Sequence, residues 1–365
     1  MKKIITCFLL SLLIVTPGCV QPEIIDEVEL IHALGYDWAG EDMVEGSVSI
    51  PLFQEEQELP MAKGSMAKSA TITTTSHTSK DLRVELSARS PKTFNSSKLS
   101  VVMYNDELAE RGIMRLVDTL RRDPVVGRRI YLCVVNGNVK QLLTTQSPLE
   151  DEVSSYLSSL IDQNIESQGL PTTNLHVFLY RYYGRGMDPY LPIIEKVNDQ
   201  IELKGLAIMK EDKLVSTINL KDAFVFKMLV ERFKRGMYEV NLGKHEFATI
   251  QNLQAHSTYK IKRGNQTPVI SVNLDMKGFI NEYSGEKLTP SKVKQIKKKV
   301  KREIQQNAEK LIKEFQEQEV DPIGFGDQVK TRTRQWDEKN WNEKYPDLDI
   351  QVTTNVQIVH SGVSD

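Results

Sequence analysis

Cysteine is scarce in this chain, with three residues at Cys7, Cys19 and Cys133. Cys7 lies within the first apolar stretch, and Cys19 follows that stretch. If Cys19 is modified, Cys133 has no partner for an intrachain disulfide. Because Cys133 stands in the apolar run 130–135, it is expected to be a small buried hydrophobic residue. The fold must then rest on its core, or the protein must reside where disulfides are not formed.

Long apolar runs are also few. The first covers 4–15 and follows Lys2 and Lys3, and after Gly18 no second run is long enough to cross a bilayer. Spanning the hydrocarbon core as a helix takes roughly 20 residues, so a permanent transmembrane anchor is disfavoured. A charged start followed by a short apolar run is typical of a secretory signal. The sequence therefore predicts an exported protein whose signal is removed.

The end of the apolar run indicates how the signal is processed. Gly18 is a small residue directly before Cys19, which is the arrangement that lipoprotein processing uses: the thiol is acylated and the preceding peptide is cut. We therefore predict that residues 1–18 are a lipoprotein signal peptide and that Cys19 is the lipid attachment site. Thr16 stands where a leucine is usual, with Pro17 after it. Ordinary signal cleavage nearby is the alternative.

Signatures of catalysis are missing. No serine lies in a nucleophile-elbow pattern, and Gly324 and Gly326 lack the further glycine and lysine of a phosphate loop. With Asp321 and Pro322 they instead predict a turn that ends the preceding helix. No two histidines have the helical spacing of a zinc motif. The sequence thus predicts no catalytic residue, no metal site and no cofactor, and it favours a non-enzymatic protein. The dispersed histidines are His32, His77, His176, His245, His256 and His360.

Charge and length set the remaining limits. The formal charge is −2, or about −4 without Lys2 and Lys3, and 26% charged with 40% hydrophobic residues is ordinary globular composition. Nothing in this balance indicates nucleic-acid binding. A chain of 365 residues suggests two or three domains at about 150 residues each. We predict an N-terminal domain at 19–190 and a C-terminal domain at 200–365, divided near the turn-rich linker Gly184–Pro192.

Hydrophobic periodicity predicts alternating strands and helices in the first half. A loop is expected at 54–69, a cap at Asp106, and a capping box at Ser147 and Glu150 before a helix that ends at Gly169. The stretch 99–135 has the β-α-β order. The predicted strands are 44–50, 99–104, 128–135 and 175–183, and the predicted helices are 79–88, 113–122 and the segment carrying Val153 to Ile165.

The second half continues with both kinds of element. Its longest feature is an amphipathic helix at about 290–320, with apolar residues three and four apart. The predicted fold class is therefore α+β and multidomain, with mixed β-sheets flanked by helices. The other predicted elements are strands at 201–209, 213–218, 269–280 and 349–360 and a helix at 219–236.

The front of the long helix is basic. Seven Lys and Arg residues between Lys292 and Arg302 oppose the helix dipole, at a cost of about 0.3–1 kcal/mol per exposed charge. Each buried aliphatic side chain contributes about 1.5–3 kcal/mol, so the apolar stripe is expected to hold the helix. The basic residues form either a solvated face or a contact with anionic lipid headgroups.

Several segments of the chain together resemble the sequences of a known family. Trp336 and Trp341 precede Tyr345 and Pro346, and we expect both tryptophans to be core anchors rather than an exposed partner patch. With these segments the chain resembles the Ger(x)C spore germination lipoproteins, the C subunits of nutrient germinant receptors. The segments are 308–312, 321–326, 336–346 and 350–358 in the C-terminal part, and 35–37, 107–113, 120–124, 131 and 204–208 before it.

The resemblance implies a lipoprotein of an endospore-forming bacterium on the outer surface of the inner spore membrane. It implies multi-pass A and B subunits as partners, α+β domains with mixed sheets, and no known catalytic residues. We therefore expect a scaffold or coupler of a germinant receptor. A nutrient-binding lipoprotein with a ligand between its halves near Gly184–Pro192 is the main alternative. An extracytoplasmic hydrolase would need a nucleophile and base that the sequence does not reveal.

Overall fold

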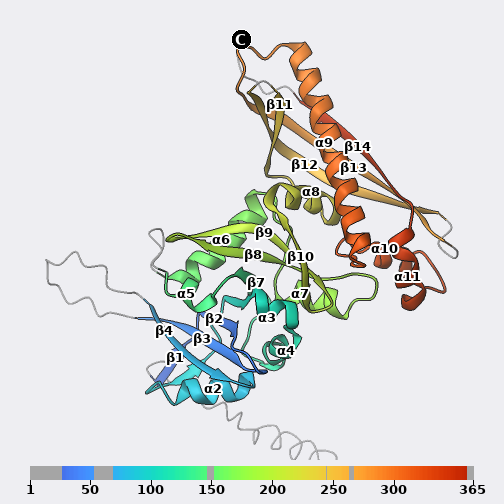
Figure 1. Cartoon of the computed structure of the whole chain (residues 1–365). Helices are drawn as coiled ribbons and strands as arrows, with labels where there is room; N and C mark the ends of the chain where they lie inside the picture. Colours follow the sequence, from blue (N-terminus) through green and yellow to red (C-terminus); the bar gives the residue numbers. More distant parts are fainter. Residues whose placement is uncertain (1–26, 53–68, 146–151, 244, 263–266, 360–365) are drawn as a thin grey trace, which may run out of the picture.

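The computed structural model describes residues 27–52, 69–145, 152–243, 245–262 and 267–359. They form one large sheet with helices at one end of the molecule and a smaller sheet crossed by a long helix at the other (Figure 1). Cys19, the loop predicted at 54–69 except Ser69, and the capping box at Ser147 and Glu150 lie outside the described residues.

The larger sheet has eight strands in the order β10-β9-β8-β7-β6-β2-β3-β4. The pairs β2·β6, β6·β7 and β7·β8 are parallel and the others antiparallel, so the sheet is mixed, as predicted. Its strands are β2 (Ala33–Trp38), β3 (Val44–Pro51), β4 (Ser69–Ser76), β6 (Val101–Asn105), β7 (Tyr131–Asn136), β8 (Tyr190–Val197), β9 (Gln200–Lys210) and β10 (Lys213–Asn219). A separate parallel pair joins β1 (Val28–Leu30) to β5 (Thr93–Asn95).

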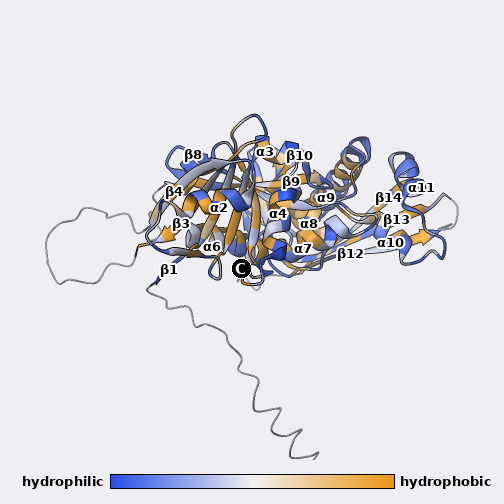
Figure 2. Ribbon diagram, turned by 90° about the horizontal axis from the view of Figure 1, so that it is seen from below, coloured by the Kyte–Doolittle hydropathy of each residue, from blue (hydrophilic) through white to orange (hydrophobic). Residues whose placement is uncertain are grey.

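Short helices cover this sheet. The connection from β6 to β7 passes through α3 and α4, which confirms the predicted β-α-β order. Figure 2 shows apolar residues along the strands and on parts of the covering helices. The helices are α2 (Ser79–Ser87), α3 (Asp106–Arg111), α4 (Met114–Arg122), α5 (Val139–Leu143), α6 (Val153–Ser167) and α7 (Leu175–Tyr183).

The prediction of a strand at 175–183 was wrong, because this segment is helix α7. The Asn174 side chain accepts a hydrogen bond from the Val177 backbone N–H at 2.9 Å and caps the helix. Leu175 and Phe178 are three residues apart and both are fully buried. This buried helical face outweighs the strand propensity of the aromatic residues, and His176 lies in this helix.

Two predicted helix ends also differ. Asn105, and not Asp106, caps α3, since the Asn105 side-chain Oδ1 accepts from the Leu108 backbone N–H at 3.0 Å. Helix α8 (Leu220–Val230) ends six residues before Gly236. The chain leaves the helix there because Phe233 exchanges two backbone hydrogen bonds with Ala255, at 3.1 and 2.9 Å.

The predicted linker at 184–192 is partly strand. Its last three residues begin β8, which pairs with β7 on one side and β9 on the other. The larger sheet therefore continues across residues 190–200 to β10. The division of the chain into domains at 19–190 and 200–365 stays a prediction.

The smaller sheet has the order β11-β12-β13-β14, with β13 and β14 parallel. Strands β11 and β12 were not predicted, because β12 is largely polar and both strands expose the residues of one face. The long helix α9 packs against the sheet, and its N-cap Thr289 accepts from the Lys292 backbone N–H at 3.2 Å. The elements are β11 (Met237–Gly243), β12 (Glu246–Lys262), β13 (Val269–Tyr283), α9 (Pro290–Glu317), α10 (Phe325–Lys330), α11 (Glu338–Lys344), the 3₁₀ turn η2 (Tyr345–Asp347) and β14 (Ile350–Ile358).

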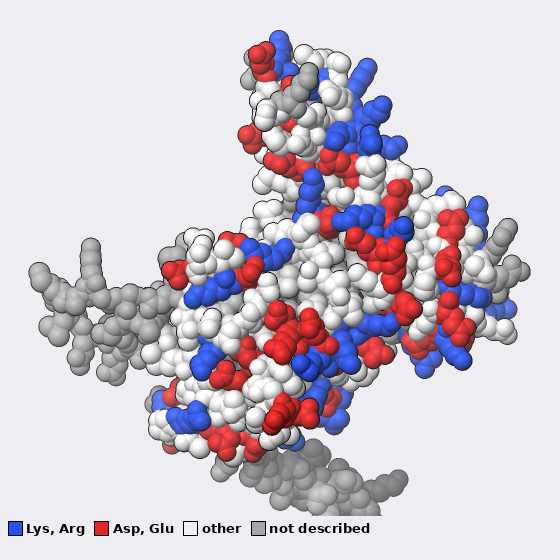
Figure 3. Space-filling view, viewed as in Figure 1, with Lys and Arg blue, Asp and Glu red and all other residues white. Residues whose placement is uncertain are grey.

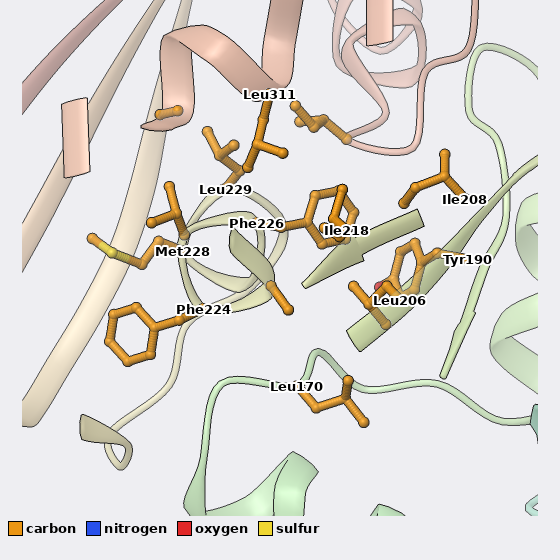
Figure 4. Packing of buried hydrophobic residues seen from close by; sticks show 14 of the residues in the cluster. Leu170, Tyr190, Leu206, Ile208, Ile218, Phe224, Phe226, Met228, Leu229 and Leu311 are labelled. Carbon is orange, nitrogen blue, oxygen red and sulfur yellow. The ribbon is translucent and has the colours of Figure 1, made fainter. Parts of the chain in front are cut away.

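Helix α8 joins the two sheets through one core. Eight consecutive residues of α8, from Asp222 to Leu229, are buried, as expected for a helix enclosed on all sides. Phe226 meets Tyr190 of β8 edge to face with ring centroids 5.0 Å apart, and it meets Phe315 of α9 at 5.9 Å. Figure 4 shows this packing between α8 and its neighbours.

Candidate binding site

The loop between α7 and β8 lies directly against the start of α10. A Cβ atom on Gly326 would stand 2.6 Å from the Gly186 Cα, and the Asp327 backbone N–H donates to the Gly186 carbonyl at 2.9 Å. Gly186 also has a φ of +76°, which glycine adopts without strain. Only glycine at both positions allows the two backbones to approach so closely.

Asp321 organises the turn into α10. Its Oδ1 accepts from the backbone N–H groups of Gly324 at 2.8 Å and Phe325 at 2.9 Å, and its Oδ2 accepts from Gly326 at 2.7 Å. Gly324 adopts the left-handed conformation at a φ of +85°. The sequence predicted a helix-breaking turn here, and the structure adds that the buried Asp321 carboxyl holds it together.

Asp188 fastens this turn to the larger sheet. Its Oδ2 accepts from the Asp321 backbone N–H at 2.7 Å, and its Oδ1 accepts from the Glu211 backbone N–H at 3.2 Å. In return the Asp188 backbone N–H donates to the Asp321 carbonyl at 2.9 Å. Two aspartates 133 residues apart thus link the α7–β8 loop, the β9–β10 turn and α10.

Burial raises the pKa of both aspartate carboxyl groups. It raises the pKa of Asp321 to about 7, with the charge of Asp188 adding to the rise and the backbone N–H groups opposing it. Burial likewise raises the pKa of Asp188, against the effect of its backbone donors and of Lys210 and Arg181. A buried carboxyl loses the hydration that favours its charged form.

The raised pKa predicts that this turn weakens as pH rises. The pKa of Asp321 is about 7 in the folded state rather than the ordinary 3.8, so the folded state binds the proton more tightly than the unfolded state. The stability that this proton contributes is therefore fully present below pH 4 and is lost as the pH rises through 7. The charge of Asp188 contributes to the raised pKa of Asp321, and the charge of Asp321 in turn contributes to the raised pKa values of Tyr345 and Tyr259. Urea unfolding at pH 5 and pH 8 should show a steeper pH dependence in the wild type than in Asp321→Asn. Equal slopes would mean that Asp321 does not titrate in this range.

A cavity of about 450 Å³ opens beside the two aspartates. Lys210 and Glu319 form an ion pair of 3.1 Å within its wall. Trp341 and Tyr345 lie with ring centroids 5.4 Å apart. The lining residues are Tyr182, Tyr183, Gly184, Gly186, Met187, Asp188, Pro189, Lys210, Glu211, Glu319, Asp321, Glu338, Trp341, Asn342 and Tyr345.

Tyr345 contributes an unusual group to this wall. Its side chain is 2% exposed, and its hydroxyl has no hydrogen-bond partner among the described residues. Burial, together with the charges of Asp321 and Asp188, raises its pKa well above the usual value. The hydroxyl is therefore uncharged and available as a donor or acceptor near the two carboxyl groups.

The sequence anticipated this site in part. Five residues of the segment Gly184–Pro192, near which the alternative hypothesis placed a ligand, line the cavity. Trp341 is 4% exposed, which confirms the core anchor, whereas Trp336 is only partly buried. Asp188 and Tyr345 were not predicted as site residues, although Asp188 lies within Gly184–Pro192 and Tyr345 follows Trp341 in the sequence.

The basic front of α9 forms a second candidate surface. Lys292 pairs with Glu246 at 2.7 Å, and Lys299 pairs with Glu303 at 3.3 Å. Five neighbours are exposed and form no ion pair with another described residue, and we call them the basic face of α9. Figure 3 shows blue residues near the end of the molecule where α9 begins. The basic face comprises Lys294, Lys297, Lys298, Lys301 and Arg302.

The remaining candidate residues are dispersed. His32 Nδ1 lies 2.9 Å from Glu152, and no three His, Cys, Asp or Glu residues within the described ranges are placed to hold a metal ion. Cys133 is fully buried as predicted, and burial raises the pKa of its thiol. Of the helices in the described part of the chain, none has the length and hydrophobicity needed to cross a membrane.

Comparison with known proteins covers nearly the whole chain. Residues 21–196 match the family model of the spore germination protein N-terminal domain, and 204–362 match the spore germination B3/GerAC-like C-terminal model. The chain is 31% identical to spore germination protein GerQC of Bacillus cereus over 369 aligned positions, covering all of both chains. It is 24% identical to the putative spore germination protein YfkR of Bacillus subtilis, covering 100% of this chain and 98% of the relative.

A solved structure is similar in fold. The crystal structure of the GerBC protein matches with a TM-score of 0.59 at 14% identity, covering 87% of this chain and 94% of the other. At this identity the likeness concerns the fold alone. Together with the two mixed sheets and their helices, it confirms the predicted α+β class.

Proposed function

Because the chain belongs to the Ger(x)C family of spore germination proteins, we propose that it is a lipid-anchored subunit of a spore nutrient germinant receptor. The observation that carries the proposal is the match to both family models over 21–196 and 204–362. In this proposal it is not an enzyme. It acts as an ectodomain scaffold or coupler for the membrane-embedded A and B subunits.

The shared core supports a coupling role. Helix α8 is buried between the larger sheet and α9, and Phe226 contacts aromatic residues on both sides. The Asp188–Asp321 contact provides a second link between the α7–β8 loop and α10. Since packed cores move as units rather than deform continuously, a partner at one sheet can influence a partner at the other.

The proposed anchor is a lipid on Cys19, which holds the protein on the extracytoplasmic face of the inner spore membrane. Glu27, the first described residue, is eight positions after Cys19, and eight steps of about 3.5 Å each reach at most about 28 Å. The end of the molecule that carries β1 would therefore lie close to the membrane. Acyl chains contribute about 0.8 kcal/mol per buried methylene, so two or more give stable anchoring.

Deleting the gene in the organism that encodes the chain should abolish germination with the nutrient that its receptor recognises. Germination by an agent that bypasses nutrient receptors should be unchanged. Complementation with the wild type should restore the response, and Cys19→Ala should leave most of the folded protein in the soluble spore fraction, as measured by immunoblotting. Unchanged nutrient germination and unchanged amounts of the A and B subunits after deletion would refute the proposed role.

A second candidate function is binding of a small molecule such as a nutrient. The 450 Å³ cavity favours it, because its volume falls in the range of about 300–1,000 Å³ that ligand pockets occupy. It lies where the α7–β8 loop meets α10 and α11, so an occupant would contact parts of the chain far apart in sequence. In a receptor subunit such an occupant would stabilise their association.

A further inference from the structure

Acidic side chains outnumber basic ones around the cavity beside Asp188 and Asp321. Five carboxyl side chains and one ammonium group line it. The ammonium of Lys210 is already paired with Glu319 at 3.1 Å, and Glu338 faces Arg185 at 3.8 Å. The remaining carboxyl groups have no cationic side chain paired with them in the described ranges. They are Asp188, Glu211 and Asp321.

The two aspartates keep acceptor positions free. A carboxylate offers about four lone-pair positions, and backbone N–H groups occupy two on Asp188 and three on Asp321. The Tyr345 side chain lines the same cavity, and its enclosed hydroxyl has no hydrogen-bond partner among the described residues. Leaving a buried hydroxyl without a partner is unfavourable, so this wall is suited to a group that donates several hydrogen bonds.

The walls suit an organic cation. Four aromatic rings line the cavity, and the face of an aromatic ring attracts a cation within about 6 Å of its centroid. Ca²⁺ is a poorer occupant because it takes six to eight oxygen ligands, whereas backbone donors already occupy five positions on the aspartates. The aromatic rings are those of Tyr182, Tyr183, Trp341 and Tyr345.

We propose that this cavity binds a small organic ammonium compound, with the ammonium group held between Asp188, Asp321 and the Tyr345 hydroxyl and the carbon skeleton against the aromatic walls. The proposal rests on the second candidate function and not on the receptor-subunit role. The proposal therefore specifies, for small-molecule binding, the class of ligand and the residues that recognise this ligand.

Calorimetric titration of the full chain in detergent tests the proposal, with propylamine and L-alanine as cationic and zwitterionic probes and 1-propanol and propionate as controls. We expect propylamine to bind, propanol and propionate not to bind, and L-alanine to bind only if a cation at the rim accepts its carboxylate. Tyr345→Phe should weaken propylamine binding about ten-fold or more, because a hydrogen bond between a hydroxyl and a charged group is lost.

Tyr104→Phe is the matched control. The Tyr104 hydroxyl is likewise buried and without a partner among the described residues, but Tyr104 does not line the cavity. Its removal should leave propylamine binding unchanged. Equal binding of propanol, tighter binding of Ca²⁺ or equal losses in the two variants would overturn the proposal. So would the absence of propylamine binding at 10 mM, which is about 10⁴ times a micromolar Kd. None of these outcomes would alter the deletion phenotype, so the two proposals fail separately.

Discussion

Replacing Asp321 by alanine is expected to lower the free energy of unfolding by about 3 kcal/mol. Removing a helix cap costs about 0.5–2 kcal/mol, and each buried donor left without a partner costs about 1–3 kcal/mol. The backbone N–H groups of Phe325 and Gly326 lose their acceptor in this variant, whereas that of Gly324 keeps the Asp321 backbone carbonyl at 3.2 Å. Relief from burying a partly charged carboxyl offsets some of the loss, which keeps the net effect well below the sum.

Urea unfolding of the full chain at pH 7 measures this difference. Asp327→Ala is the control, because Asp327 stands in the same short helix, is half-buried and pairs only with Lys330 at 3.5 Å. Its loss should change stability by no more than about 1 kcal/mol, as for surface ion pairs. If both variants unfold at the same urea concentration, the turn at Asp321 does not stabilise the fold.

The sequence revealed this turn but not its partner. An aspartate before a proline, followed by two glycines, predicts a chain reversal from local conformational preferences. Asp188 is 133 residues away, and no local preference connects the two. The cavity depends on that contact and on the position of Tyr345, so it could be described only after the fold was known.

The difference between signals within a segment and contacts with distant residues also explains which elements were predicted correctly. Helix α9 shows its buried stripe within its own sequence, so its period was sufficient evidence. Strand β12 is paired with β11 and β13 and has a polar outer face, so its apolar alternation is weak. In α7 the aromatic composition favoured a strand, while the deciding signals were the cap at Asn174 and the surface that buries Phe178.

Helix α9 is held by its stripe in spite of unfavourable end charges. Seven of its residues are buried, and Pro290 follows the cap Thr289 at its start. Its last turn also positions the cavity, because the Gln316 side chain donates to the carbonyls of Tyr345 at 2.8 Å and Leu348 at 3.0 Å. Loss of packing near this end should therefore affect both the core and the cavity wall.

Phe315→Ala is expected to destabilise the protein by about 3–5 kcal/mol, the range for deleting a buried phenylalanine side chain. Phe315 is 1% exposed and packs edge to face on Phe226, which joins α8 to the larger sheet. The charge variant Lys297→Glu, on the basic face of α9, should be neutral or stabilising by about 0.2–0.5 kcal/mol, because it places a glutamate four residues before Lys301 on the helix. Urea unfolding compares the two. A larger loss in Lys297→Glu than in Phe315→Ala would mean that the basic face, and not the apolar stripe, holds the helix in place.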